Sequence, residues 1–403
     1  MSPQITNPES WQSSVPETGI PDNPPRQSLT WALIGQAYAP VSIPPKGWGA
    51  VEGILWDYKT WLEKLGHKVV IVNTDDRRKI IDTINRCRPD VVHVHQHNFA
   101  DILNKIRVPV KIFTSHSGYR LSKRATWWPL QEHFVQYLKD GLFFFVLSPV
   151  WRKVFLDCGY NPDEVFVTLN GADHRRFRFR KTPLHENRSI YLGQITVNKK
   201  QSLYQAIDSI DFAGPLSDDK KFDKTHKNYL GEWTRDTLYE HLSDYANLVI
   251  LSKAEVAAPL VVLEALVCGL GVVVSTAASG NLDTKLPWIS VIPDEKTTDV
   301  AFVEAEIARN REISLRHREQ IREYGIENFS WEKLVPRYAD LCLKLHAEKA
   351  ARQGFSARSA DTLRRLRYLL LALPSLFFHA VRRLIFTSLP RKIRRLFRIE
   401  NHA

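Results

Sequence analysis

The chain has 403 residues, of which 44% are hydrophobic, and this length predicts two domains rather than one core. The net charge is +12, but from Ala351 onward twelve Lys and Arg stand against two acidic residues, so the rest of the chain is almost neutral. A basic surface for nucleic acid is therefore not expected on the body of the protein. The cysteines are far apart and lack CxxC spacing, which argues against a disulfide framework and a zinc site and favours the cytoplasm.

The first 28 residues are polar and rich in proline. They lack the basic, apolar and small-residue regions of a signal peptide. We interpret residues 1–28 as a disordered lead-in.

From Leu29 onward, short apolar runs alternate with helical stretches. Strands are predicted at "WALIGQAYA", "KVVIVNT", "DVVHVHQH", "VKIFTSHS" and "LFFFVLS", with helices at Val51–Leu65 and "IIDTINRC". Strands rich in Val, Ile and Phe between amphipathic helices indicate βαβ units around a parallel sheet. Residues 29–180 are therefore predicted to form a Rossmann-like N-terminal domain.

The alternation pauses at Phe177–Arg188, a polar stretch with a proline that we interpret as a linker. It restarts with strands at "SIYLGQ", "IDFAGP", "NLVILSK", "GVVVST" and "WISVIP", and with helices near Leu203, from Pro259 and through Leu345. Residues 181–350 thus form a second predicted domain of the same α/β class. Two doubly wound domains would face each other across a cleft, because ligands bind such folds at the carboxyl ends of the strands.

Two segments of this predicted cleft suit a phosphate. "GWGAVE" opens the first long helix, and Gly49 would let backbone N–H groups approach an anion there, although an ordinary glycine turn is the alternative. "YLGQITVNKK" ends a strand at Gly193 and brings Lys199 and Lys200 to the next helix. Ammonium groups at that position could meet a phosphate, although exposed lysines are usually only solvated.

A third segment, "SKAEVAAPLVVLEALVCGLGVVVST", places two carboxylates around a proline-led helix. Pro259 suits the first helical position, so the unpaired amides of Leu260 and Val261 would point into the cleft and favour a diphosphate. The carboxylates of Glu255 and Glu264 would instead accept hydrogen bonds from sugar hydroxyls. Together these groups predict a nucleotide-sugar site.

The same segments carry a resemblance to a known family. The chain resembles the retaining glycosyltransferases of the GT-B fold, glycosyltransferase family 4, from about Leu29 to Leu345. The matching motifs are "DVVHVH", "VLSPVWRKVFLDCGYNPDEVFVTLNGADHRRF", "PLVVLEALVCGLGVVVS" and "FSWEKL", in the expected order. The resemblance implies a final helix that returns to the N-terminal domain, and it implies neither a cofactor nor a metal ion.

The resemblance also implies roles for individual residues. Glu264 matches the Glu that contacts the ribose, and Lys199 matches a lysine that holds the diphosphate. His116 matches an N-domain histidine beside the donor sugar, and Gly49 matches the turn near the diphosphate. Glu255 would be the loop Glu that contacts the donor sugar.

Three departures from the family pattern stand out. Eight residues separate Glu255 from Glu264 instead of seven, so either the loop bulges by one residue or Glu255 has a weaker role. Gln194 stands in place of an arginine that would help to bind the donor, a loss for which Lys200 could compensate. Ala50 replaces a second glycine, which matters only if that residue needs a positive φ.

Some conspicuous residues favour structural interpretations. His93, His95 and His97 alternate along a predicted strand and share one face of it. No carboxylate or cysteine nearby completes a metal site, so we favour packing or lining of the cleft. Trp127 and Trp128 could face an acceptor, but buried packing is the preferred interpretation.

Residues 351–403 form a predicted basic amphipathic tail. The longest uncharged run, Tyr368–Val381, has fourteen residues, too few to span a bilayer. Apolar residues alternate with arginine clusters, as in helices that lie in a membrane interface. The residues predicted to contact an anionic membrane are Arg364, Arg365, Arg367, Leu370, Phe377, Phe378, Arg382, Arg383, Arg391, Lys392, Arg394, Arg395 and Arg398. The alternatives are a helical hairpin packed on the body or on the partner in a homodimer, and an RNA-binding arm.

These features predict a retaining glycosyltransferase attached peripherally to the cytoplasmic face of a membrane. Its donor would be a nucleotide-sugar, and its acceptor a lipid-linked glycan, a glycolipid or a lipopolysaccharide. One alternative is a GT-B enzyme with a soluble acceptor, such as a sucrose- or trehalose-type synthase, or an epimerase. Another is a catalytically inactive membrane scaffold.

Overall fold

The protein is described by a computed structural model. It covers residues 27–35, 41–95, 99, 102–103, 105–116, 142–157, 160–253, 255 and 257–353. Several segments and residues discussed above lie outside the described residues. They are most of the lead-in, His97, Trp127, Trp128 and every residue predicted to contact a membrane.

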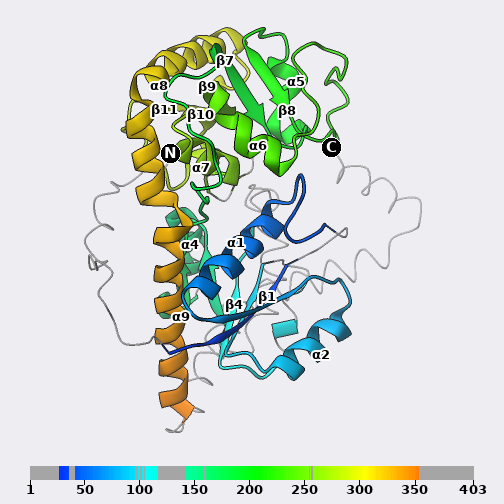
Figure 1. The fold of residues 1–403 in the computed structure, drawn as a ribbon, viewed down its shortest axis with the longest axis vertical. Coiled ribbons are helices and arrows are strands. Elements are labelled where there is room, and N and C mark those ends of the chain that lie inside the picture. The colour runs from blue at the N-terminus through cyan, green and yellow to red at the C-terminus, as the bar shows by residue number, and fades with distance from the viewer. Residues whose placement is uncertain are drawn as a thin grey trace.

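The described chain folds around two parallel sheets, one above the other in Figure 1. The first has the strand order β2-β1-β3-β4-β5-β6. Its strands are β1 (Thr30–Ile34), β2 (Lys68–Val72), β3 (Val91–Val94), β4 (Val110–Phe113), β5 (Phe143–Val146) and β6 (Val165–Val167). The second has the order β11-β10-β9-β7-β8. Its strands are β7 (His185–Leu192), β8 (Ile210–Ala213), β9 (Tyr245–Ile250), β10 (Gly271–Ser275) and β11 (Ile289–Ile292).

Helices cover both sheets. They are α1 (Ala50–Lys64), α2 (Arg77–Cys87), α4 (Pro149–Asp157), α5 (Gln201–Tyr204), α6 (Arg235–His241), α7 (Leu260–Val267), α8 (Val300–Phe329) and α9 (Trp331–Gln353). Alternating residues of β1 enter opposite cores: Ala32 and Ile34 pack toward α2 and α4, whereas Trp31 and Leu33 pack toward α1 and α9. The strands are apolar on both faces because both faces are covered.

The predicted doubly wound α/β architecture is confirmed, with local differences. The strand β6 and the helices α4 and α6 were not predicted. The strand β7 begins at His185, inside the segment interpreted as a linker. The prediction missed this start because the first residues of the strand are exposed and polar, and only its last four are buried. The predicted boundary between the domains falls between the end of β6 and the start of β7.

The two long C-terminal helices divide between the domains (Figure 1). The helix α8 packs on α7, β9 and β10, whereas α9 packs on α1 and β4 of the first domain. The chain changes direction at Ser330, where Ala172 is held from both sides: its N–H donates to Phe329 O and its carbonyl accepts from the Trp331 N–H. Within the described residues, no helix combines the length and the apolar composition needed to cross a bilayer.

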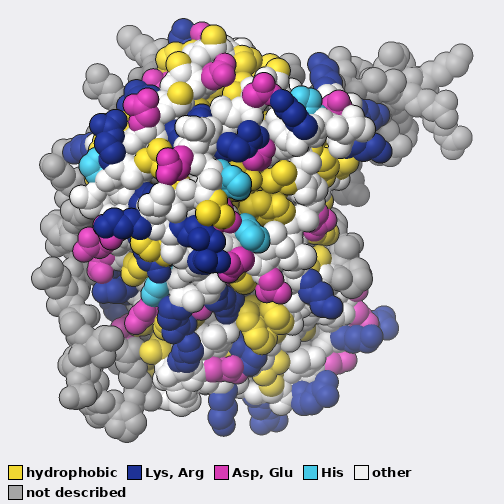
Figure 2. All heavy atoms as spheres, turned by 45° about the horizontal axis from the view of Figure 1, so that its top comes forward, with side chains coloured by type: hydrophobic (Ala, Val, Ile, Leu, Met, Phe, Trp, Pro, Cys, Tyr) yellow, Lys and Arg dark blue, Asp and Glu magenta, His cyan; other side chains and the backbone are white. Residues whose placement is uncertain are grey.

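Charged side chains of both signs are mixed over the face in Figure 2. This mixture agrees with a body of the chain whose net charge is small once the basic C-terminal segment is set aside. The face therefore offers no extended field of one sign that would attract nucleic acid.

Gly325 provides a test of the packing between α7 and α8. A Cβ on Gly325 would lie 2.5 Å from the carbonyl carbon of Leu266. We expect Gly325→Ala to lower the stability measured by thermal unfolding by about 1–3 kcal/mol, because backbone must move to make room. The matched control is Gly53→Ala in α1, where the nearest atom, Pro45 Cγ, would be 3.8 Å away. The control should be neutral or stabilising, and equal stability of the two variants would contradict this account of the packing.

Candidate functional site

A cavity of about 400 Å³ lies between the two domains. The first domain contributes the loop Gly47–Gly49, the start of α1 and the segments that follow β4 and β5. The second contributes residues that follow β7, β8 and β9, together with the N-terminal ends of α6 and α7. The cavity is thus at the carboxyl ends of both sheets, where doubly wound folds bind ligands.

Most of the predicted site residues line this cavity. They are Gly49, His116, Gln194, Lys199, Glu255, Pro259, Leu260, Val261 and Glu264. Lys200 is not among the lining residues, and its ammonium instead donates to the Thr297 hydroxyl. The reason is local: Lys200 has a left-handed backbone with φ of 56°, which turns its side chain away from that of Lys199. This geometry does not support the prediction that Lys200 replaces the positive charge that is missing at Gln194.

The glycine loop brings the start of α1 to the cavity. Gly49 is the N-cap residue of α1 and has a φ of 125°, which side chains rarely tolerate. A Cβ on Gly49 would also lie 2.9 Å from Val41 Cγ1. Ala50 is the first residue of α1 and is not among the residues with positive φ. The absence of a second glycine is therefore compatible with this turn.

Lys199 is held at the carboxyl end of β7 by its backbone. The Tyr191 hydroxyl donates to Lys199 O at 2.5 Å and accepts from the Leu251 N–H at 2.9 Å, which ties the loops after β7 and β9 together. The Lys199 ammonium lies 2.8 Å from the position that a Cβ on Gly193 would take. The missing side chain of Gly193 therefore makes room for the ammonium group.

The start of α7 faces the same cavity. Pro259 is its N-cap, one position before the one predicted, and no side chain caps the helix. Pro259 O accepts the Val262 N–H at 2.9 Å. The amides of Leu260 and Val261 have no acceptor among the described residues, so this helix end offers two N–H donors and the positive end of a helix dipole.

Glu264 is paired with an arginine that was not predicted. The Arg235 Nη2 donates to Glu264 Oε1 at 2.5 Å, and the Glu264 residue is only 3% exposed. Arg235 begins α6, which Thr234 caps through the Thr237 N–H. Thr234 as a capping residue and Asp236 in the first turn were the available sequence signals for α6. Nothing in the sequence indicated that Arg235 would lie beside Glu264.

Glu255 lies beside Lys199 in the lining of the cavity. Burial raises the pKa of Glu255, while the Lys199 ammonium and Ser252 act to lower it. The loop therefore brings the Glu255 carboxylate within electrostatic range of the Lys199 ammonium. Val256, the residue at the family's spacing, lies outside the described residues.

His93 and His95 are buried between β3, β4 and α9, and the half-buried His116 extends this histidine stack to the cavity. His93 bonds to Tyr338 Oη at 3.0 Å and to Thr114 Oγ1 at 2.8 Å. His95 Nδ1 lies 3.1 Å from His116 Nε2, and the two rings are stacked. Burial lowers the pKa of His116 to about 4, so this ring is neutral at pH 7.

The histidine stack does not form a metal site with acidic or cysteine side chains. Within the described part of the chain, no group of three or more His, Cys, Asp and Glu side chains is arranged to hold a metal ion. His93 and His95 pack between the sheet and its helices, as the interpretation from the sequence favoured.

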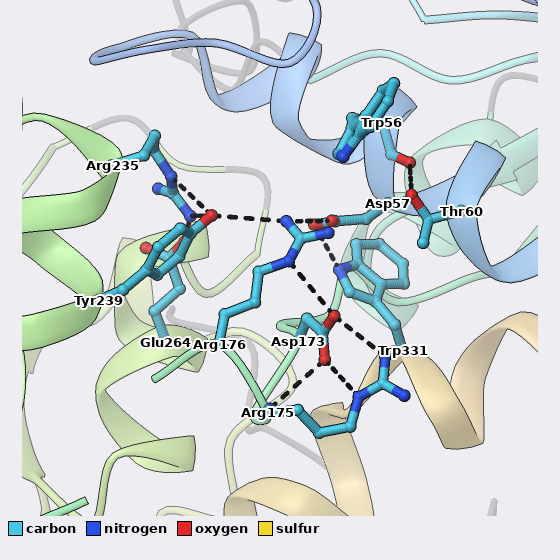
Figure 3. A network of polar contacts seen from close by, with 10 residues as sticks. All are labelled: Trp56, Asp57, Thr60, Asp173, Arg175, Arg176, Arg235, Tyr239, Glu264 and Trp331. Carbon is cyan, nitrogen blue, oxygen red and sulfur yellow. Dashed lines mark hydrogen bonds and ion pairs between the residues drawn. The ribbon is translucent and has the colours of Figure 1, made fainter. Parts of the chain in front are cut away.

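A network of polar contacts joins the site to α1 and α9 (Figure 3). The Tyr239 hydroxyl accepts from Arg235 Nε and Nη2 at 3.2 Å and from Arg176 Nη1 at 3.5 Å. Arg176 Nη1 lies 3.0 Å from Asp57 Oδ1, and Asp57 Oδ2 accepts from Trp331 Nε1 at 2.9 Å. The network therefore runs from α6 to α1 and α9 of the first domain.

Comparison with solved structures identifies the architecture. A sucrose-phosphate synthase from Thermosynechococcus elongatus is 14% identical, with a TM-score of 0.61 over 79% of this chain and 100% of that one. AviGT4, a glycosyltransferase of avilamycin A biosynthesis, is 19% identical, with a TM-score of 0.58 over 79% and 98%. HepE of Anabaena, in complex with UDP and glucose, is 12% identical, with a TM-score of 0.57 over 78% and 99%.

The chain has the GT-B fold. No protein-family model matches the chain, and no curated protein matches it. Each of these three structures matches about four fifths of the chain and leaves out the rest of its length.

The histidine stack predicts how stability depends on pH. An unfolded histidine gains a proton below about pH 6.5, whereas burial keeps His116 neutral until about pH 4. Stability should therefore fall as the pH drops through this window, and His116 alone accounts for about 2 kcal/mol at pH 5.

The variant His116→Asn should lose less stability than the wild type between pH 7.5 and pH 5 in denaturant unfolding. The control His185→Gln removes an exposed imidazole at the start of β7 and should keep the wild-type dependence. A pH dependence of His116→Asn equal to that of the wild type would contradict the assignment.

Proposed function

We propose that the chain is a retaining glycosyltransferase that moves a sugar from a nucleotide-sugar donor to an acceptor. One observation carries the proposal: one cavity of the GT-B fold brings together an ammonium group, an uncapped helix start and the carboxylates of Glu255 and Glu264. A nucleoside diphosphate sugar has the complementary groups, an anionic centre with a hydroxylated ring on each side.

The cationic and N–H groups suit the diphosphate. Lys199, Leu260 and Val261 line the same cavity. Lys199 follows β7, and the α7 start with its free amides follows the neighbouring strand β9. Charge grows on the diphosphate as the glycosidic bond breaks, so fixed donors there stabilise the transition state more than the ground state. These groups require no metal ion as a partner, and we expect none.

The remaining polar groups suit the sugars. In this proposal Glu264 accepts hydrogen bonds from the ribose and Glu255 accepts them from the transferred sugar; both residues line the cavity. A neutral His116 exchanges hydrogen bonds with hydroxyls without adding charge to the site. In a front-face mechanism, the leaving diphosphate takes the proton of the acceptor hydroxyl, and no protein nucleophile is needed.

We place the acceptor at a membrane, on a lipid-linked glycan, a glycolipid or a lipopolysaccharide. The reason is the arginine-rich amphipathic sequence of residues 364–398, because a chain held at the head-group plane meets acceptors confined to that plane. A soluble acceptor is the second candidate, since one matching structure is a sucrose-phosphate synthase.

Lys199→Ala tests the electrostatic part of the mechanism. We expect turnover to fall by at least about a hundredfold, the usual loss for one such contact. The control Lys227→Ala removes an ammonium that pairs with Asp208 at the surface, 3.0 Å away, and should leave turnover unchanged. Near-normal turnover by Lys199→Ala would remove this residue from the mechanism.

The donor can be found by a thermal-shift screen of UDP-, GDP- and ADP-sugars. A ligand that binds only the folded chain raises its unfolding temperature by mass action. A stabilising donor that is also slowly hydrolysed would support an enzyme, whereas stabilisation without hydrolysis or transfer would favour the inactive scaffold. No stabilisation by any nucleotide-sugar would contradict the proposed function.

Sedimentation with vesicles tests the membrane role. We expect the full chain to sediment with phosphatidylglycerol-containing vesicles and to be released by high salt, since its arginines would meet anionic head groups. A chain that ends at residue 353 should remain in the supernatant. Equal sedimentation of both chains would exclude residues 354–403 as the anchor.

A further inference from the structure

Arg235 occupies a position that connects three parts of the site. Its side chain bonds to Glu264, its guanidinium lies over the Tyr239 ring at 4.8 Å, and its N–H donates to Lys46 O at 2.8 Å. Lys46 precedes the glycine loop of the first domain, whereas Tyr239 and Glu264 belong to the second. One residue is thus fixed to both walls of the cavity.

The contacts of Arg235 leave its guanidinium little freedom. The Tyr239 hydroxyl accepts from both Nε and Nη2, so the plane of the guanidinium is set by two hydrogen bonds to one atom. Nη2 also donates to Glu264 Oε1, so Arg235 engages one of the two carboxylate oxygens. A carboxylate fixed through one oxygen presents the other in a defined direction.

Burial makes this pairing necessary for Glu264. Its side chain is only 4% exposed, and an ionised carboxylate at that depth needs a cation or several hydrogen bonds. Among the described residues that line the cavity, the cationic side chains are Lys199 and Arg235, and Arg235 is the one bonded to Glu264.

We propose that Arg235 is a positioning residue that holds Glu264 in the orientation that recognises the ribose of the donor. The inference rests on the proposed function, because it requires a ribonucleotide in the cavity. It differs from direct binding of the diphosphate by Arg235, since the effect of Arg235 would pass through Glu264 and would therefore concern the ribose hydroxyls.

Calorimetric titration of the full chain with UDP, GDP, ADP and their 2′-deoxy counterparts tests this inference. We expect the wild type to prefer the best ribonucleotide over its deoxy form by about tenfold, the value of one hydrogen bond to a charged group. Arg235→Met should weaken binding of the ribonucleotide and leave the deoxy form nearly unchanged, so that the preference approaches one.

Matched variants separate positioning from other roles. Glu264→Gln should also remove the preference, and adding Arg235→Met to it should cause no further loss. Arg178→Met removes a surface ion pair with Glu240 and should keep the wild-type preference. If Arg235→Met does not fold, Tyr239→Phe keeps both charges of the pair and should lower the preference several-fold.

The outcomes distinguish this inference from the proposed function. A full ribose preference in Arg235→Met, or in Tyr239→Phe, would overturn the positioning role while the site remains a nucleotide site. Equal losses for the ribose and deoxy forms would also overturn it and would indicate contact of Arg235 with the diphosphate. Failure of the wild type to bind any of the nucleotides would overturn the proposed function itself.

Discussion

The close approach of two glycines at the ends of β7 and β8 is the constraint on which the cavity depends. A Cβ on Gly214 would overlap with the carbonyl oxygen of Gly193, and a Cβ on Gly193 would collide with the Lys199 ammonium. Both glycines have positive φ, 149° and 135°, so the backbone itself excludes other residues. The bond from Tyr191 to Lys199 O then fixes the loop that carries the ammonium group. The fold thus accommodates the Lys199 ammonium by having glycines, which lack side chains, around it.

Contacts between the domains add a second constraint. Arg235 reaches Lys46 on one side of the cavity, and the Asn281 amide reaches Leu147 O on another. Between them, Tyr239 and Arg176 link α6 to Asp57, where burial raises the carboxyl pKa to about 6 against the lowering effect of Arg176. The relative position of the domains is therefore tied to polar groups that also line or support the site.

Sequence reasoning located those parts of the fold and site that follow from periodicity and strand ends. Apolar runs buried on both faces marked the strands, and the shared carboxyl edge of a parallel sheet brought Lys199 and Glu264 to one cavity. The strand β6 was missed because it has three residues and only one of them is buried. Arg235 was missed because its partner lies 29 residues further along the chain, a pairing without a local signal. Lys200 was misplaced because adjacency to Lys199 does not reveal a left-handed backbone.

The helix α9 has a consequence for how the protein is made. Its residues Trp331, Val335 and Tyr338 complete the core on one face of the first sheet, although they are synthesised after the whole second domain. Domains commonly fold in order of emergence from the ribosome. Here the earlier domain emerges with an apolar face uncovered and reaches its final packing only after α9 has been synthesised. On the ribosome, the first domain should therefore keep an exposed apolar face until α9 can pack on it.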